Sequence, residues 1–328
     1  MVILMLATLL TLFAGTYPDR QTGAQINRFF NRNTLLQTAT DASFIAVMAV
    51  GATFVIISRG IDLSVGSIYA LSGVMMAMLL EKIEPIGDGS VFALGLSMCL
   101  GVALIAGLLN GVMVVVLRVH PFIVTLGTMW VFRGIAFVSS EAKSILVPPA
   151  LNDMAKAPLG VGPGLYPIPM LVMLAVTGLG AVLLSRTVMG RHIFAVGGNP
   201  EASRYCGLPI GRILIGVYVV SSLCAGIAAF IGSSFYGAAS SADGTGYELY
   251  VIAAAVVGGA SLTGGRGSAV NAMLGAVLIV LIRQSIRTLH LDQNYEWIII
   301  GSAIIAAVVL DRASGQFAKH RLARAAAR

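Results

Sequence analysis

Long runs of apolar residues, separated by short polar segments, make up most of the chain. A helix that crosses the hydrocarbon core of a bilayer needs about 20 predominantly apolar residues. The runs that approach this length predict helices at about 2–16, 37–58, 61–80, 91–117, 121–140, 167–185, 212–232, 249–263, 269–288 and 295–310. Strands of a transmembrane barrel would instead alternate apolar and polar residues in segments of about ten. The pattern therefore predicts an all-α, polytopic membrane protein with about ten spanning helices, organised as one transmembrane domain over residues 1–328.

Two regions need a separate interpretation. The first run begins at Met1 without a basic flank or the small-residue cleavage site of a signal peptide, so we expect it to be a span. The connection at 139–166 is rich in proline and glycine. We expect it to be an irregular outer loop with a short surface helix.

The stretch "SRGIDLSVGS", residues 58–67, places polar residues and glycines between two apolar runs. Gly60 is suited to end the first helix, and Asp62 and Ser64 are both suited to cap the next one. Polar backbone at membrane depth is tolerated only where protein or water covers it. Two interpretations therefore stay open. The stretch is either a capped connection between helices, or a hinge in which Gly60, Asp62, Ser64 and Gly66 border a translocation path.

A second glycine-rich interruption, "VVGGASLTGGRGSAV", covers residues 256–270. The run before it, at 249–263, is short for a span, which predicts a broken or re-entrant helix of the kind that lines transport sites. The alternative is a tight turn in which glycines adopt positive φ. The candidate path residues of this segment are Gly258, Gly259, Ser261, Gly264 and Gly265.

The longest inner connection, at 185–212, contains a predicted short helix. Pro200 and Glu201 suit a first helical turn that Asn199 caps. Gly207 suits its end. Such a helix is either a plain connector or a lever through which an external ATPase moves the bundle. The candidate coupling residues are Gly198, Asn199, Pro200, Glu201, Ala202 and Gly207.

The segment "HPFIVTLGTMWVFRG" predicts a helix that begins at Pro121 and carries Arg133 within a span. An arginine at such a position extends its side chain toward the interface or faces a polar cavity. We therefore keep Arg133 as a candidate residue of the substrate path.

Composition and charge agree with a membrane protein. Hydrophobic residues make up 57% of the chain and charged residues 11%, whereas a soluble domain carries about 25% charged residues. If both termini are cytoplasmic, inner segments hold twelve of the 21 Lys and Arg residues, outer segments hold eight, and Arg133 is the last. This bias predicts a multi-pass protein of the bacterial inner membrane with both termini cytoplasmic. The basic stretch 319–328 suits either contact with anionic lipid or a solvated tail.

The sequence contains no motif that indicates catalysis. GxxxxGK[ST], HExxH and GxSxG are all absent, and the three cysteines and four histidines lack the spacing of metal ligands. Ionisable residues in or beside apolar runs are few, namely Asp41, Asp62 and Arg133. An ion-driven carrier usually displays buried acids as relays. We therefore expect a protein that is not an enzyme, holds no cofactor or metal of its own, and takes energy from a partner protein.

Four motifs together resemble a known family. "GIDLSVGS", "PFIVTLGTMWVFRG", "VGGNPEASRYCGLP" and "VVGGASLTGGRGS" occur in the order and spacing of the ribose/xylose/galactose-type permeases of ATP-binding-cassette (ABC) sugar importers. The resemblance implies an all-helical permease that works in pairs, as a homodimer or with a related subunit. It implies two further partners: a cytoplasmic subunit that binds ATP and a periplasmic sugar-binding protein. Membrane lipid is a partner expected from the apolar composition, and nucleic acid is not expected, because membrane topology explains the net charge of +7. It also implies that residues 199–202 form a coupling helix that docks on the ATPase, and that residues 60–66 and 258–267 border the translocation route.

Arg59 departs from the family pattern, which usually has a second glycine at this position. We expect the bulky cation to alter the hinge or to anchor at the inner interface. The ligand also stays open. A monosaccharide is the main hypothesis, an autoinducer-2-like or nucleoside ligand is the alternative, and an ion-coupled secondary carrier is a third possibility. The sequence assigns neither the sugar nor the identity of the second permease subunit.

Overall fold

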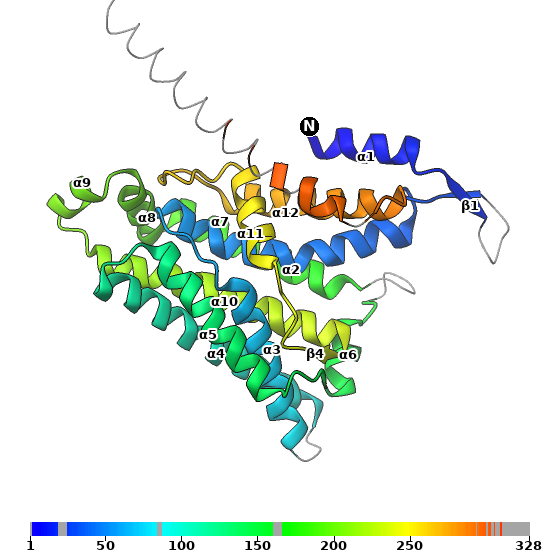
Figure 1. Cartoon of the computed structure of the whole chain (residues 1–328), viewed down its shortest axis with the longest axis horizontal. Helices are drawn as coiled ribbons and strands as arrows, with labels where there is room; N and C mark the ends of the chain where they lie inside the picture. The colour runs from blue at the N-terminus through cyan, green and yellow to red at the C-terminus, as the bar shows by residue number, and fades with distance from the viewer. Residues whose placement is uncertain are drawn as a thin grey trace, which may run out of the picture.

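The computed structural model describes residues 2–18, 25–83, 87–159, 166–292, 294–299, 301–302, 305 and 309. Helices account for most of them (Figure 1). The helices are α1 (Val2–Phe13), α2 (Arg32–Ile57), α3 (Val65–Lys82), α4 (Asp88–Leu117), α5 (Pro121–Ser139), α6 (Pro149–Ala155), α7 (Pro167–Arg186), α8 (Val188–Gly198), α9 (Pro200–Tyr205), α10 (Ile210–Tyr236), α11 (Tyr247–Val257) and α12 (Ala269–Thr288). Two antiparallel pairs join β1 (Thr16–Pro18) to β2 (Gln25–Asn27) and β3 (Ile145–Leu146) to β4 (Ala238–Ala239). The prediction of a helical membrane protein is confirmed.

The number of spanning helices differs from the prediction of about ten. Within the described residues, seven helices are long and apolar enough to cross a membrane: α2, α3, α4, α5, α7, α10 and α12. α1 has 12 residues and α11 has 11. At about 1.5 Å per residue they extend about 16–18 Å, against a hydrocarbon core of about 30 Å. Of the last predicted helix, 295–310, the structure describes 295–299, 301, 302, 305 and 309, all of them helical. The other residues of this range lie outside the described part of the chain, so the predicted count is not confirmed.

α2 is the central helix of the bundle. Every residue from Ala42 to Ile57 is buried, and α7, α10, α11 and α12 pack around this helix. The apolar stretch of α2 is 94% buried, compared with 33% for α4 and α5 and 28% for α7. These three outer helices leave large apolar side chains on the surface, where lipid is as apolar as the side chains themselves.

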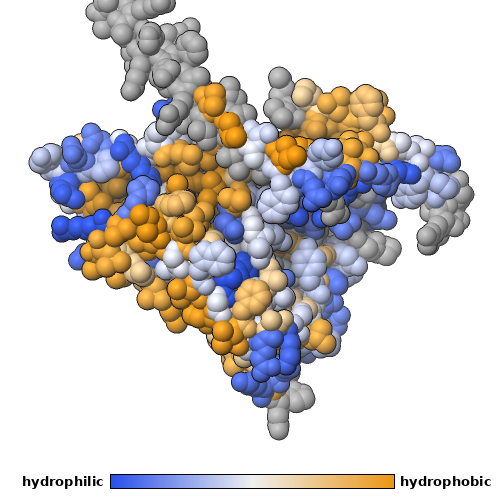
Figure 2. Space-filling view, viewed as in Figure 1, coloured by the Kyte–Doolittle hydropathy of each residue, from blue (hydrophilic) through white to orange (hydrophobic). Residues whose placement is uncertain are grey.

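The bundle has two polar ends. α8 and α9 lie at one end, and β1, α6 and β4 lie toward the other (Figure 1). Figure 2 shows hydrophilic residues over both ends and hydrophobic residues over α4 and α5 between them. α10 has 27 residues, so this helix extends about 40 Å from the α9 end to the β4 end. α6 confirms the short helix expected within residues 139–166.

Candidate functional site

Three loops that are distant in sequence meet at the α9 end of the bundle. The Arg59 side chain, just after α2, contacts the last two residues of α8, Gly197 and Gly198. The backbone N–H of Gly265 donates to the carbonyl oxygen of Ile57 at 2.8 Å. We call residues 57–60, 197–198 and 264–265 the three-loop junction. It joins the end of α2, the end of α8 and the connection between α11 and α12.

Arg59 occupies a backbone position that favours glycine. Its φ is +67°, and its N–H donates to the carbonyl oxygen of Ile56 while Gly60 N–H donates to Val55. These two bonds define a Schellman ending of α2, with Arg59 as the left-handed residue. α2 ends at Ile57, one residue before the predicted end at 58, and Gly60 supplies one of the two closing bonds. Arg59, and not Gly60, is the residue with positive φ. A second glycine here would adopt this conformation without strain.

The Arg59 side chain offsets that strain by binding the end of α8. Its Nε donates to the carbonyl oxygen of Gly197 at 2.6 Å, and Nη2 donates to that of Gly198 at 2.7 Å. The last carbonyl groups of a helix have no partner within the helix, and they carry the negative end of its dipole. A guanidinium group therefore suits them. These contacts fasten Arg59 to the end of α8. The expected anchoring at the inner membrane interface stays a prediction.

Backbones approach closely within the three-loop junction. A Cβ atom added to Gly197 would overlap the carbonyl oxygen of Ile57 and lie 2.7 Å from the amide nitrogen of Gly265. By contrast, a Cβ atom on the neighbouring Gly198 would meet no atom within 4 Å. The close packing therefore requires a glycine at position 197.

α9 is the predicted short helix with the predicted cap. Asn199 Oδ1 accepts a hydrogen bond from the N–H of Ala202 at 3.0 Å, and Pro200 occupies the first helical position. The helix ends before Gly207, whose φ is +76°. α9 buries only Ser203. Its Glu201, Ala202, Arg204 and Tyr205 are exposed, so α9 presents a free surface.

Asp62 lies in a buried polar network beside the three-loop junction. Its Oδ1 accepts hydrogen bonds from the backbone N–H and hydroxyl of Ser64, and its Oδ2 accepts one from the hydroxyl of Ser221 on α10. Asn110 on α4 donates to the Ser64 hydroxyl at 2.7 Å. All four residues are buried. Ser64 is the residue before α3 but makes no side-chain capping bond to it, so the expectation that both residues cap α3 directly is wrong.

The motif "PFIVTLGTMWVFRG" also reaches this region. Thr125, in the first turns of α5, donates from its hydroxyl to the carbonyl oxygen of Ile61 at 3.1 Å. The connection between α2 and α3 is therefore held by α4, α5 and α10.

The second glycine-rich segment is a tight turn that follows a shortened helix. α11 ends at Val257, not at residue 263 as predicted, because Gly259 adopts a φ of +92°. Gly264 and Gly265 also have positive φ. The hydroxyl oxygens of Ser261 and Thr263 lie 2.9 Å apart. A Cβ atom on Gly258 would overlap the backbone of Asn271 in α12. The backbone shows both a helix too short to span a membrane and a turn with glycines at positive φ, so the broken-helix and turn interpretations both stay open. The predicted role in a path stays a prediction.

Arg133 belongs to a different cluster from the three-loop junction. From α5, its Nη1 donates to the carbonyl oxygens of Ser241 and Asp243, at 2.7 and 2.5 Å, in the connection between α10 and α11. Gly66, in the first turn of α3, faces the carbonyl oxygen of Gly244 in the same connection. The predicted path residues therefore divide into two groups, and Arg133 and Gly66 both position the segment that leads into the short α11.

The chain matches the protein family described as "Branched-chain amino acid transport system / permease component" over residues 34–308. The chain belongs to this family. The permease is 33% identical over 314 residues to the D-allose transport system permease protein of Escherichia coli (strain K12), covering 94% of this chain and 90% of that protein. It is 36% identical over 284 residues to the ribose import permease protein of the same strain, covering 86% and 87%. It is also 31% identical over 285 residues to the autoinducer 2 import system permease protein of Photorhabdus luminescens, covering 87% and 83%.

These matches confirm the family resemblance stated from the four motifs. The permease is a multi-pass membrane protein, and the relatives above are transport permeases and not enzymes. Sequence reasoning located all three segments of the three-loop junction but did not predict that they meet. The available signal was the departure at Arg59. Reasoning from the sequence also left out Ser221 and Asn110, which are ordinary polar residues within apolar runs.

Proposed function

We propose that the permease is the transmembrane subunit of an ABC importer for a monosaccharide, and that α9 is the element on which the cytoplasmic ATPase acts. One observation carries this proposal. The exposed, capped α9 directly follows the α8 end, and that end is joined by Arg59, Gly197 and Gly265 to the breaks between α2 and α3 and between α11 and α12.

The geometry supports a mechanical role for this chain. ATP binding closes the partner ATPase and displaces α9. The three-loop junction transmits the displacement, because its backbones are too close to move independently. The connections after α2 and after α11 then shift relative to α10, and the pathway changes the side to which it is open. No bond in the sugar is made or broken by this chain, and ATP is bound by the partner subunit.

The distribution of charge supports an orientation. With α8 and α9 on the cytoplasmic side of the bacterial inner membrane, both termini are cytoplasmic and the inner loops hold the excess of Lys and Arg. The opposite end, near β1, α6 and β4, then receives ligand from a periplasmic binding protein. A second permease subunit, identical or related, completes the pathway. Residues 60–66, 258–267 and Arg133 border it.

A monosaccharide is the proposed ligand because the D-allose and ribose permeases are 33% and 36% identical to this chain. The autoinducer 2 permease is 31% identical. An autoinducer-2-like ligand is therefore the second candidate, and it would be transported by the same mechanism.

Reconstitution tests the proposal. The permease is placed in liposomes with its ATPase and binding protein, and uptake of radiolabelled pentoses, hexoses and autoinducer 2 is measured with and without ATP. We expect sugar uptake only with ATP and both partners. Uptake that persists without the ATPase and collapses with an ion gradient contradicts the proposal and identifies a secondary carrier. If autoinducer 2 is the single compound taken up, the proposed ligand is wrong and the proposed ATP-driven mechanism still holds.

A further inference from the structure

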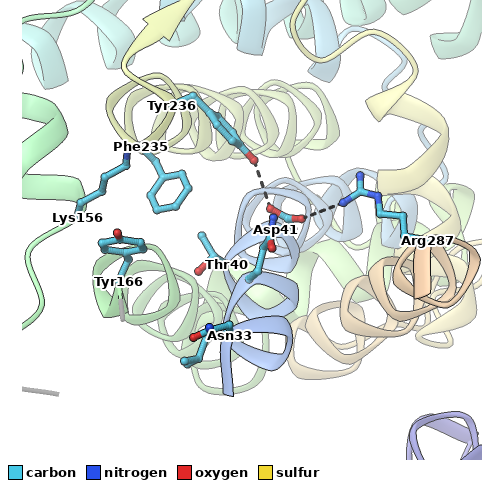
Figure 3. Close-up of a pocket in the computed structure, with 10 residues that line it drawn as sticks. Asn33, Thr40, Asp41, Lys156, Tyr166, Phe235, Tyr236 and Arg287 are labelled. Carbon is cyan, nitrogen blue, oxygen red and sulfur yellow. Dashed lines mark hydrogen bonds and ion pairs between the residues drawn. The ribbon is translucent and has the colours of Figure 1, made fainter. Parts of the chain in front are cut away.

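A pocket of about 630 Å³ lies at the end of the bundle away from α9 (Figure 3). The first turns of α2, the ends of α10 and α12, Lys156 directly after α6 and Tyr166 directly before α7 form its walls. Ligand sites in proteins typically measure about 300–1,000 Å³. The pocket is therefore large enough for one small molecule with water, and no residue of the three-loop junction contributes to it.

One wall of the pocket is aromatic. Tyr166, which precedes α7, and Phe235, near the end of α10, meet edge to face with their ring centroids 5.6 Å apart. The ring of Tyr236 lies 5.4 Å from that of Phe235. The ammonium group of Lys156 lies 5.4 Å from the Phe235 centroid. Such a wall offers apolar ring faces with polar groups at their edges.

The opposite wall is polar and comes mainly from one face of α2. Asn33, Gln37 and Asp41 follow one another at helical spacing and line the pocket. Tyr236 Oη donates to Asp41 Oδ1 at 3.3 Å, and Arg287 Nη1 lies 3.7 Å from Asp41 Oδ2 (Figure 3). A carboxylate offers about four acceptor sites, so these two contacts leave room for a ligand. Asn33 and Gln37 are exposed, and their amides offer both donors and acceptors.

This combination matches the chemistry of a neutral polyol. Adjacent hydroxyl groups need donors and acceptors side by side, which the carboxylate, the amides and the guanidinium group supply. The C–H face of a sugar ring packs on an aromatic face. The charges of the pocket are matched in part, because Arg287 faces Asp41. Lys156, which lies over the Phe235 ring, is a single further cation. An anionic ligand would instead call for several unmatched cations.

We propose that this pocket is a receiving site that binds a monosaccharide through its hydroxyl groups before the sugar enters the pathway. The proposal rests on the proposed function for its ligand class. It adds a site within a single subunit, at the end that would face the binding protein. α2 and α10 both extend from this pocket toward the α9 end. Ile57, the last residue of α2, belongs to the three-loop junction, and Ser221, near the middle of α10, belongs to the Asp62 network.

Saturation-transfer difference NMR on the full-length permease in nanodiscs tests the site without its partners. The probes are D-ribose, D-xylose, D-allose, D-galactose and D-fructose at millimolar concentration, with ribose 5-phosphate as the anionic comparison. The test variant combines Gln37→Ala and Tyr166→Ala. Gln37 is exposed, and Tyr166 makes no capping bond to α7. Tyr205→Ala, which removes an exposed tyrosine at the opposite end, is the matched control.

We expect signal from at least one neutral sugar in the native protein and in Tyr205→Ala, and at least a fivefold loss in the double variant. The proposal is overturned if no neutral sugar gives signal, if only ribose 5-phosphate does, or if the double variant keeps the native signal. These outcomes are distinct from failure of the proposed function. If uptake is driven by ATP but no sugar binds in the pocket, only the receiving-site proposal fails. If sugar binds in the pocket but uptake does not depend on the ATPase, only the proposed function fails.

Discussion

Arg59 and Gly197 are separated by 138 residues in the sequence, yet Arg59 Nε lies 2.6 Å from the Gly197 carbonyl oxygen. The contact joins the end of the central helix α2 to the end of α8, directly before the exposed α9. Arg59 adopts a left-handed backbone conformation to make it. Two motifs that look like separate turns in the sequence are therefore parts of one structural unit.

Replacement of Arg59 by glycine separates the two effects of this residue. The substitution relieves a left-handed strain of about 1–2 kcal/mol but removes two hydrogen bonds to the α8 end, each of about 0.5–1.5 kcal/mol. Arg118→Gly is the matched control, because Arg118 also has a positive φ, +54°, and is exposed. We expect Arg59→Gly to be less stable than Arg118→Gly by about 1–3 kcal/mol, as measured by thermal unfolding in one detergent. Equal stabilisation by both substitutions would show that the Arg59 side chain contributes nothing.

Gly197 and its neighbour Gly198 give a second matched pair. A methyl group at Gly197 overlaps the Ile57 carbonyl oxygen, whereas one at Gly198 meets open space. We expect Gly197→Ala to lower the free energy of unfolding by about 1–3 kcal/mol. Gly198→Ala should change it by less than about 0.5 kcal/mol. Thermal unfolding and gel filtration of the two variants in the same detergent make the comparison. If the two alanine variants unfold at the same temperature, the backbones at the three-loop junction do not approach as closely as described.

Local signals in the sequence predicted the local structure well. Asn199, Pro200 and Gly207 lie within nine residues of one another, so the sequence alone indicates the cap, the first turn and the end of the helix. α9 has this predicted form. α12 covers the predicted 269–288. The predicted end at 263 lies six residues beyond the observed end of α11 at Val257, because an apolar run does not show which of several glycines takes the positive φ.

Contacts between distant segments could not be predicted in this way. The three-loop junction is built largely from backbone atoms of Ile57, Gly197 and Gly265, and these leave no side-chain pattern to detect. The pocket in Figure 3 combines side chains from α2, α10 and α12 with the connection before α7. Asp41 stands out in the sequence as an ionisable residue within an apolar run, but nothing in the sequence places Tyr236 and Arg287 beside it.

Asp62 distinguishes an importer driven by ATP from an ion-coupled carrier. In Asp62→Asn one amide oxygen still accepts from Ser64, so we expect a folded protein whose ATP-driven uptake stays within about twofold of native. In Asp62→Ala the buried groups of Ser64 and Ser221 lose their acceptor, at about 1–3 kcal/mol each, and stability should fall sharply. The two variants are compared by thermal unfolding and by uptake in liposomes. A folded Asp62→Asn protein without any transport would indicate that protonation of this carboxylate is part of the cycle.

The central claim is that the ATPase acts through α9, and one measurement addresses it most directly. Glu201→Lys with Arg204→Glu reverses the charges on the exposed face of α9, and Glu81→Lys, an exposed acid at the far end of α3, is the control. ATP-dependent sugar uptake is measured in liposomes that contain the permease, its ATPase and its binding protein. We predict at least a tenfold loss of uptake for the α9 variant, with native thermal stability, and native uptake for the control. Native uptake by the α9 variant would contradict the account.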